Sequence, residues 1–417
     1  MNKEPELLVT PRQPLRPQAA SVRRGGLARR MVFVAPGIES AVEGEWCESH
    51  GGRYFVATQR LAADRVHGLA PLSDLYRVPL DALSKLCREP AISQGEMASA
   101  VFVDTETTGL EQNAGTLVFL VGMLYFQDGE FHIRQYFMDG VAGEAAMLAA
   151  AAEFISDFSI LVTFNGKSFD LPMLQMRLNM QNIPNKLDQL PHADLLFPAR
   201  RLWKLRLGTC RLTALERLIL GLHRTGDVAG AQIPEVYYRY LSDRDPAPLA
   251  SVFYHNAQDL LPQLAIPSEA GRRFDAPFEG RVQAGLDFLC LGKVYEALGD
   301  EDSALRAYDR ALNLPMHTSA RVEACKRITP LYKRRELMEH AVLLWEQMLS
   351  DGDVHGVFPY KELAKYYEHD EQRYDRAEAL LVQALNMLTR DSCTRTSRQE
   401  LEKRLLRVRT KRSAHSS

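Results

Sequence analysis

Hydrophobic positions in the first half of the chain either alternate with polar ones or form short apolar runs, as they do in β-strands. Such runs occupy residues 99–103, 116–126, 130–137 and 160–164. The alanine-rich stretch 143–158 has instead the length and composition of a helix. Three strands in succession, followed by a helix and a further strand, predict an α/β fold in which helices flank a mixed sheet.

Two segments precede this block. Residues 1–34 are rich in Pro, Arg and Gly without a hydrophobic period, which predicts a disordered basic arm. In residues 35–98, the pair Gly51-Gly52 separates two short runs in the manner of a β-hairpin, and a helical pattern follows. We therefore expect an N-terminal extension of hairpin and helix ahead of a domain at 99–270.

Strand patterns end at about residue 270, and a helical repeat begins. Its spacing follows the tetratricopeptide pattern, in which small residues let paired helices approach and aromatic residues fill the gaps. The alternative is a generic bundle of helical hairpins. We expect tetratricopeptide-like repeats over 271–390 and a basic tail over 391–417. The positions that carry the pattern are Leu291, Gly292, Tyr295, Ala304, Tyr308, Ala311 and Pro315, with weaker copies at Tyr332, Ala341, Trp345 and Met348 and at Leu363, Ala364, Tyr367, Ala377, Leu381 and Ala384.

Composition narrows the class of protein. The chain has 417 residues, of which 46% are hydrophobic and 25% charged, as in ordinary globular proteins of several domains. Its longest strongly apolar stretch, residues 117–126, is about half of the roughly 20 residues that a membrane helix needs. The six cysteines form no CxxC pair and no cluster with histidine, so neither a zinc site nor a disulfide framework is indicated. We expect a cytoplasmic protein with no membrane contact.

Charge is distributed unevenly behind a net charge of −2. Both ends of the chain carry an excess of Lys and Arg, so the middle carries an excess of acids. Such a distribution suits a protein that uses carboxylates for metal and cations for a polyanion, although solubilising tails would give the same pattern.

Two carboxylates follow the first strand of the central block. Asp104 and Glu106 are two residues apart, so both side chains point to the same face of the strand. Neighbouring anions repel each other, and an apolar strand is a costly place for them. A divalent cation with a preference for oxygen ligands, such as Mg²⁺ or Mn²⁺, would offset the repulsion better than a structural salt bridge.

Three further residues complete a candidate site. Asp170 lies at the start of a helix, after a glycine turn and the strand 160–164, although an isolated aspartate there could be a simple helix cap. His255 and Asp259 are four residues apart and share one face of a helix, although such a pair is common on surfaces. Together with Asp104 and Glu106, they predict a metal site with a histidine beside it.

The motifs as a set resemble those of the DEDD exonuclease superfamily on the ribonuclease H-like fold. The resemblance lies in Asp104-Thr105-Glu106, in Asp170 after an Asn and a Phe, and in His255 with Asp259. Over residues 35–268 the chain is similar to bacterial YprB-type ribonuclease H-like proteins. The segments that carry this similarity are 104–110, 165–170, 192–196 and 200–203.

The resemblance implies a mechanism with two divalent ions, Mg²⁺ or Mn²⁺. It assigns Asp104, Glu106, Asp170 and Asp259 as their ligands, and His255 with Glu106 as the catalytic residues. It also implies release of nucleotides from a single-stranded 3′ end of DNA or RNA. Relatives with a catalytic histidine commonly place it five residues before the last Asp, where this chain has Tyr254. We favour His255 because an ordinary histidine pKa near 6.5 suits proton transfer at neutral pH.

Substrate contacts are expected beside these carboxylates. The resemblance places Thr107, Thr108, Gly109 and Leu110 around the terminal nucleotide, where Gly109 would permit a tight turn. Residues 200–224 carry seven Lys or Arg against one Glu, with Trp203 among them, which is typical of a path for nucleic acid but also of a solvated helix face. The candidates for further contacts are Asn165, Lys167, Arg201 and Trp203.

The whole chain therefore predicts a metal-dependent nuclease, with 3′-5′ exonuclease activity, whose helical repeat binds a protein partner or guides the substrate. The alternatives are an endonuclease with the same metal centre and a scaffold that binds nucleic acid without cutting it.

Overall fold

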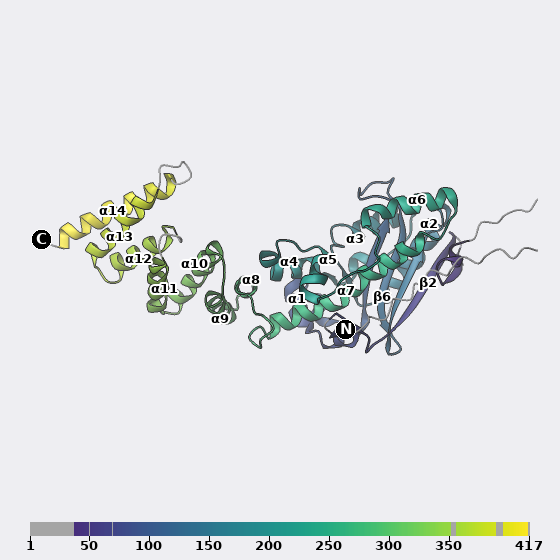
Figure 1. Cartoon of the computed structure of the whole chain (residues 1–417), viewed down its shortest axis with the longest axis horizontal. Coiled ribbons are helices and arrows are strands. Elements are labelled where there is room, and N and C mark those ends of the chain that lie inside the picture. The colour runs from purple at the N-terminus through teal and green to yellow at the C-terminus, as the bar shows by residue number, and fades with distance from the viewer. Residues whose placement is uncertain (1–36, 50, 69, 352–355, 389–394, 416–417) are drawn as a thin grey trace, which may run out of the picture. The chain divides into compact units, whose positions relative to one another are not determined.

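The computed structural model describes residues 37–49, 51–68, 70–351, 356–388 and 395–415 (Figure 1). The expected basic arm, residues 1–34, lies outside this part of the chain. The described residues form two compact units that divide between Pro277 and Phe278. The first unit holds a mixed sheet with helices packed against it, and the second is all-helical. This is the fold class that the sequence predicts.

The sheet of the first unit has seven strands in the order β1-β2-β7-β6-β5-β8-β9. β5, β8 and β9 run parallel to one another, and all other neighbours are antiparallel. The four strands expected at 99–164 are present. The short strand β9 was not predicted. The bounds are β1 Glu45–Ser49, β2 Gly52–Ala62, β5 Ala100–Thr107, β6 Val118–Gln127, β7 Glu130–Phe137, β8 Ile160–Thr163 and β9 His192–Asp194.

The predicted hairpin joins this sheet. β1 and β2 pair from Ser49 opposite Gly52, and Gly52 adopts a φ of 118°, which only glycine adopts readily. The strand β2 continues well past the hairpin and pairs with β7 along Phe55 to Ala62. The segment expected as an extension ahead of the domain is therefore part of its sheet. A separate two-stranded sheet, β3 (Val66–His67) and β4 (Ala70–Pro71), follows it.

Helices cover both faces of the sheet. Tyr125 on β6 packs against Phe154 of helix α2, and Gly122 on the same strand faces Asn256 of helix α7. Because strand side chains alternate between faces, residues 122 and 125 point in opposite directions. Helices α2 and α7 therefore lie on opposite faces. The helices of the first unit are α1 Leu80–Cys87, α2 Glu144–Ile155, α3 Asp170–Met180, α4 Leu196–Leu207, α5 Leu212–Leu215, α6 Ile233–Asp243 and α7 Leu249–Asp275.

The second unit consists of consecutive helices, each packed against the next. The residues of the predicted repeat are buried between them, except Pro315, which is exposed. Gly292 is needed because a Cβ there would lie 2.4 Å from the Tyr308 ring. Its assignment to the tetratricopeptide family stays a prediction. The bounds are α8 Gly285–Ala297, α9 Glu301–Leu312, α10 Thr318–Arg334, α11 Met338–Ser350, α12 Phe358–His369, α13 Tyr374–Met387 and α14 Arg395–His415. In the described part of the chain, no helix combines the length and the apolar character that crossing a membrane requires.

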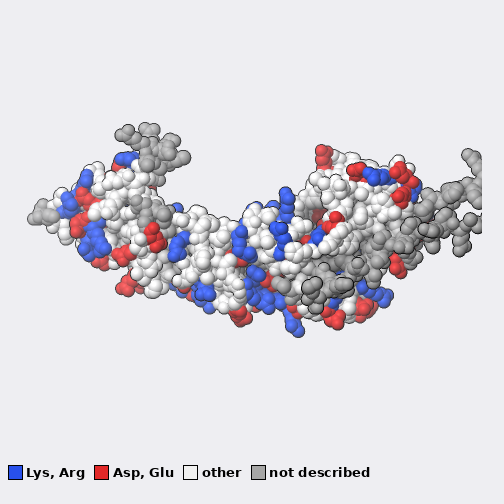
Figure 2. All heavy atoms as spheres, in the orientation of Figure 1, with Lys and Arg blue, Asp and Glu red and all other residues white. Residues whose placement is uncertain are grey.

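Most of the expected basic tail is the helix α14, which packs on α13 with Leu401 and Val408 buried. Basic and acidic side chains lie next to one another on the surface around these helices (Figure 2). Glu368 of α12, 1% exposed, accepts hydrogen bonds from Arg404 (2.8 Å), Arg407 (2.7 Å) and Lys411 (3.0 Å) of α14. These basic residues therefore serve the packing of the repeat.

We expect Glu368→Gln to destabilise the helical unit by about 3 kcal/mol, because it leaves several cations around an uncharged side chain. Burial favours the protonated acid, but hydrogen bonds from Arg407 and Lys411 outweigh it and lower the pKa of Glu368 to about 2. The ionised carboxylate thus stabilises the fold fully above about pH 4.5, and this contribution is lost as the pH falls toward 2. The measurement is the melting temperature against pH, with the exposed Glu402→Gln as control. A difference between wild type and Glu368→Gln that stays constant with pH would contradict this assignment.

Candidate active site

Three residues paired across neighbouring strands of the sheet form the base of the site. Asp104 on β5 lies opposite Gly122 on β6, and Gly122 lies opposite Gln135 on β7. Paired residues point to the same face, which here is the face covered by α7. Gly122 has no side chain, and a Cβ there would lie 1.9 Å from the amide oxygen of Asn256. The glycine therefore opens the space through which Asn256 reaches the strand.

Asn256 links helix α7 to Asp104. Its amide nitrogen donates to the Asp104 carboxylate at 2.9 Å and to the Asp104 carbonyl at 3.2 Å. The amide oxygen of Asn256 accepts from Gln135 Nε2 at 2.9 Å. Gln135 Nε2 also donates to the Phe253 carbonyl at 2.8 Å. Asn256 is fully buried. These bonds fix the orientation of the Asp104 side chain and the position of α7 together.

Sequence reasoning gave Asn256 and Gln135 no role. The signal that identifies them is the register Asp104–Gly122–Gln135, which the spacing within any one motif does not contain.

Asp170 reaches β5 from the start of α3. The pairing of β5 with β8 ends at Phe102, so the N–H of Thr105 has no strand partner on that side. Asp170 accepts from this N–H at 3.0 Å and from the Thr105 hydroxyl at 2.6 Å. Asp170 is therefore fixed next to the strand that carries Asp104 and Glu106.

The loop before α3 is held by its own contacts. Asn165 has a φ of 69°, a conformation that asparagine tolerates better than most residues. Asp194 at the end of β9 accepts from the backbone N–H of Asn165 at 2.8 Å and of Lys167 at 3.0 Å. A Cβ at Gly166 would lie 2.3 Å from the Thr163 hydroxyl, so glycine is required there.

His255 and Asp259 lie one turn apart on α7, with His255 Nε2 3.6 Å from an Asp259 oxygen. The other ring nitrogen, Nδ1, lies 2.8 Å from an oxygen of Asp227. Asp259 also pairs with Arg224 at 2.5 Å. Asp227 and Arg224 thus belong to the site, although Asp227 was not predicted and Arg224 was expected only as part of the basic stretch 200–224.

Burial and neighbouring carboxylates raise the pKa values of Asp104, Glu106 and Asp170. Desolvation, followed by the charges of Asp259, Asp170 and Glu106, raises the pKa of Asp104 well above its ordinary value. Burial raises the pKa of Glu106 to about 8, and it raises that of Asp170 to about 6 although the Thr105 hydrogen bonds oppose the change. Burial lowers the pKa of His255, but Asp227, Asp259 and Glu106 outweigh it and raise the value. The protein alone therefore does not supply enough positive charge to offset the burial and mutual repulsion of Asp104, Glu106 and Asp170.

The donor set fits hard divalent cations. Within the described residues, no three His, Cys, Asp or Glu side chains already form a metal-binding group. The four carboxylates are nevertheless close enough to repel, and oxygen ligands are those that Mg²⁺ and Mn²⁺ prefer. A bound divalent cation would remove the conflict that raises the pKa values of Asp104, Glu106 and Asp170.

A cavity of about 450 Å³ opens beside these carboxylates. Asp104 and Asp259 line it together with Asn165, which was expected to bind substrate. Three exposed cations, Arg200, Lys204 and Arg211, line the same cavity, and none of them pairs with a carboxylate of a described residue. Lys and Arg side chains gather on the surface around α4 (Figure 2). The cavity thus combines carboxylates with cations suited to phosphate groups.

Two expectations about the basic stretch were wrong. Trp203 is fully buried, so it presents no face on which a base could stack. Arg224 is 11% exposed and ion-paired, so it is not available to nucleic acid. Arg201 is half-buried above the Phe197 ring, whereas Arg200 and Lys204, four residues apart, form the exposed face of α4 that lines the cavity. The four-residue spacing was the signal that could have separated them.

The turn after β5 is built from its threonines. The Thr107 hydroxyl donates to the Gly109 carbonyl at 2.7 Å, and the Thr108 hydroxyl accepts from the Leu117 N–H at 2.9 Å. Gly109 has no positive φ, and a Cβ there would meet nothing nearer than 3.7 Å, so the tight turn does not require glycine. The Leu110 side chain, which follows this turn, is 86% exposed.

The Lys167 ammonium nitrogen lies 3.8 Å from a carboxylate oxygen of Glu89.

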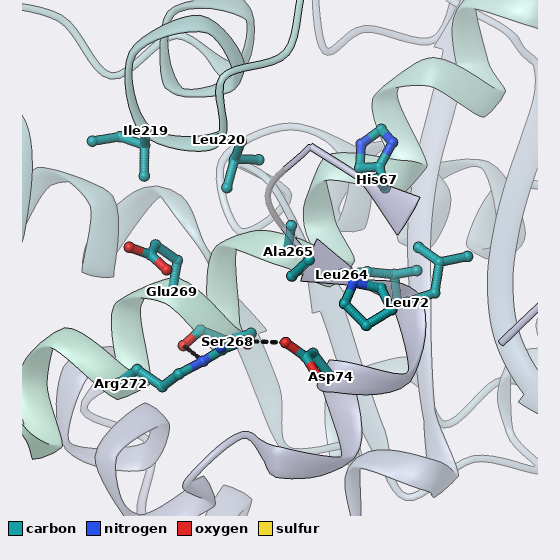
Figure 3. Close-up of a pocket in the computed structure, with 12 residues that line it drawn as sticks. His67, Leu72, Asp74, Ile219, Leu220, Leu264, Ala265, Ser268, Glu269 and Arg272 are labelled. Atoms are coloured by element: carbon teal, nitrogen blue, oxygen red, sulfur yellow. Dashed lines mark hydrogen bonds and ion pairs between the residues drawn. The ribbon is translucent and has the colours of Figure 1, made fainter. Parts of the chain in front are cut away.

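A second cavity lies beside helix α7, which lines it together with His67, Leu72, Asp74, Ile219 and Leu220 (Figure 3). Arg272 donates there to Asp74 at 3.1 Å and to Ser268. Its volume of about 30 Å³ holds about one water molecule. It is too small for a nucleotide.

The chain is similar to a family model and to known proteins. Residues 101–267 match the family model of the RNase H superfamily. The chain is 29% identical over 360 residues to "Uncharacterized protein YprB" of Bacillus subtilis (strain 168), with 84% of each chain covered. A family B DNA polymerase of Pyrobaculum calidifontis is similar at 15% identity and a TM-score of 0.32, over 57% of this chain and 29% of the polymerase chain. The expected similarities to the RNase H superfamily, over residues 101–267, and to YprB are thus found, and the DEDD subtype stays a prediction.

We expect Glu106→Gln to stabilise the metal-free protein at pH 8 by more than about 1.4 kcal/mol, the equivalent of one pKa unit. Because folding raises this pKa from 4.5 to about 8, the folded state binds more protons than the unfolded state between these values, and wild-type stability falls as the pH rises. Denaturant unfolding in a chelator at several pH values measures the effect, with the exposed Glu48→Gln as control. Parallel pH slopes for wild type and Glu106→Gln would refute the assignment.

Proposed function

We propose that this protein is a metal-dependent nuclease that acts as a 3′-5′ exonuclease on single-stranded ends of DNA or RNA. The observation that carries the proposal is the set of repelling carboxylates beside a cavity that is also lined by three cations, none of which is paired with an acid of the described residues. Divalent cations would neutralise the carboxylates, and a polyanion would bind to the cations that line the cavity. The RNase H-like fold of residues 101–267 supports this reading.

In this proposal Asp104, Glu106, Asp170 and Asp259 hold two ions, Mg²⁺ or Mn²⁺. Bound there, such ions supply Lewis-acid chemistry, which acidifies water and stabilises the charge that develops on a phosphate. Asn256 and Thr105 orient Asp104 and Asp170 for this purpose. His255 accepts the proton of the attacking water through Nε2, the nitrogen nearer to Asp259.

The substrate would lie along the cations of the cavity. Arg200, Lys204 and Arg211 contact phosphates, with Lys167 and Arg201 as further candidates. Thr107 to Leu110 accommodate the terminal nucleotide, and the exposed Leu110 side chain offers it an apolar contact. The nuclease domain would span residues 99–270 together with the hairpin strands, and the helical unit would bind a protein partner or guide the substrate. A cytoplasmic location stays a prediction from composition.

The first test is cleavage of 5′-labelled single-stranded DNA and RNA in Mn²⁺. We expect a descending ladder from wild type and a loss of more than about 100-fold with Asp104→Asn, because a ligand should matter more than the outer-shell groups that are typically worth 10–100-fold. Asp81→Asn, an exposed carboxylate of α1, is the matched control. Oligonucleotide products would indicate an endonuclease instead. Binding without cleavage by both wild type and Asp104→Asn would indicate the scaffold.

The second test concerns the cations of α4. The double variant Arg200→Ala/Lys204→Ala should weaken binding of single-stranded nucleic acid and reduce the slope of log affinity against log salt by about 0.7 per lost phosphate contact. Lys85→Ala, an exposed lysine paired with Asp81, serves as control. An unchanged slope would remove α4 from the substrate path.

A further inference from the structure

Arg224 is the centre of a buried ion network beside the site. Its guanidinium donates to both oxygens of Glu216 at 2.6 and 2.8 Å and to Asp227 at 3.0 Å. It also pairs with Asp259 at 2.5 Å. These acids come from the π-helical turn Glu216–Leu220, from the following loop and from α7. Arg224 therefore holds that loop against the helix that carries His255 and Asp259.

The sequence of α7 contributes one further acceptor. Pro262 lies inside this helix and has no N–H, so the carbonyl of Gln258, four residues earlier, lacks its helical partner. Arg224 donates to this carbonyl at 3.3 Å. The proline thus leaves an acceptor on α7 that anchors the guanidinium.

Asp227 connects this network to the histidine. One carboxylate oxygen accepts from Arg224 at 3.0 Å, and the other lies 2.8 Å from Nδ1 of His255. Hydrogen bonds from His255 and Arg224 outweigh the effect of burial and lower the pKa of Asp227, so this group is an ionised carboxylate. An ionised carboxylate only accepts hydrogen bonds, and the hydrogen between the two groups must therefore be on Nδ1.

We propose that Asp227, held by Arg224, is a positioning residue that fixes the tautomer and the orientation of His255, so that Nε2 faces the active-site carboxylates. With the hydrogen on Nδ1 in the neutral ring, the lone pair is on Nε2, which lies 3.6 Å from Asp259. The inference rests on the proposed function for its consequence in catalysis, but the tautomer itself can be observed without any substrate.

The variant Asp227→Asn tests this directly, because Arg224 dictates how the new amide lies. The guanidinium has only donors, so the amide oxygen must face Arg224 and the amide NH₂ must face His255. Nδ1 then becomes an acceptor, and the neutral ring carries its hydrogen on Nε2. A change that is nearly isosteric should thus invert the tautomer.

The measurement is two-bond ¹H–¹⁵N NMR on the full chain labelled with ¹⁵N-histidine, at a pH where the neutral ring dominates. His255→Gln identifies the signals of His255. Asp74→Asn is the matched control, since Asp74 is a carboxylate that accepts from Arg272 of the same helix at 3.1 Å. We expect Nδ1–H in wild type and Asp74→Asn, and Nε2–H in Asp227→Asn.

In the cleavage assay, Asp227→Asn should lower kcat by about 100-fold with little change in KM, since general base catalysis is worth about 10²–10⁴. An Nε2–H tautomer in wild type, or an unchanged tautomer in Asp227→Asn, would overturn the inference. If Asp227→Asn does not fold, the wild-type spectrum still tests the inference, because the inference requires the hydrogen of the neutral ring to be on Nδ1. Inversion of the tautomer in a protein that cleaves no nucleic acid would support the positioning role and reject the proposed function.

Discussion

The concentration of carboxylates at the end of β5 is the constraint around which the first unit is organised. Asp104 and Glu106 point to one face of β5 directly after its apolar residues 100–103, and Asp170 approaches the strand from its edge. Asp170 raises the pKa values of both Asp104 and Glu106, and Glu106 raises that of Asp104, so the arrangement is costly to the metal-free fold. The surrounding hydrogen bonds reduce this cost without removing it, and that is the physical basis for a cation site here.

Helix α7 contributes side chains to this group of carboxylates from two of its faces. Its buried face brings Asn256 to Asp104 through the space left by Gly122. Its next face brings His255 and Asp259 over the same carboxylates, where Arg224 and Asp227 hold them. Asn256 lies between these two residues in the sequence, so the contact that docks the helix also sets where the histidine and the last carboxylate lie. The site and the core of the unit are therefore not independent.

Charged residues in the two units have different uses. In the helical unit, Glu368 accepts hydrogen bonds from three basic residues of α14. These residues of the expected basic tail are therefore paired within the fold. In the first unit, Arg200, Lys204 and Arg211 stay unpaired with described acids and line the cavity. The count of basic residues in a segment does not distinguish these cases, because pairing depends on which acid the fold brings near.

The sequence by itself determined the features that depend on neighbours along the chain. Period-two strands, the hairpin at Gly51-Gly52, the shared face of Asp104 and Glu106, and the change to helices near residue 270 all follow from local pattern. Only the tertiary structure decided the partners. Asn256 meets Asp104 across 152 positions, Trp203 turns into the core, and Asp227 meets His255. These contacts depend on strand register and on which helix face is buried, and packing of the whole unit sets both.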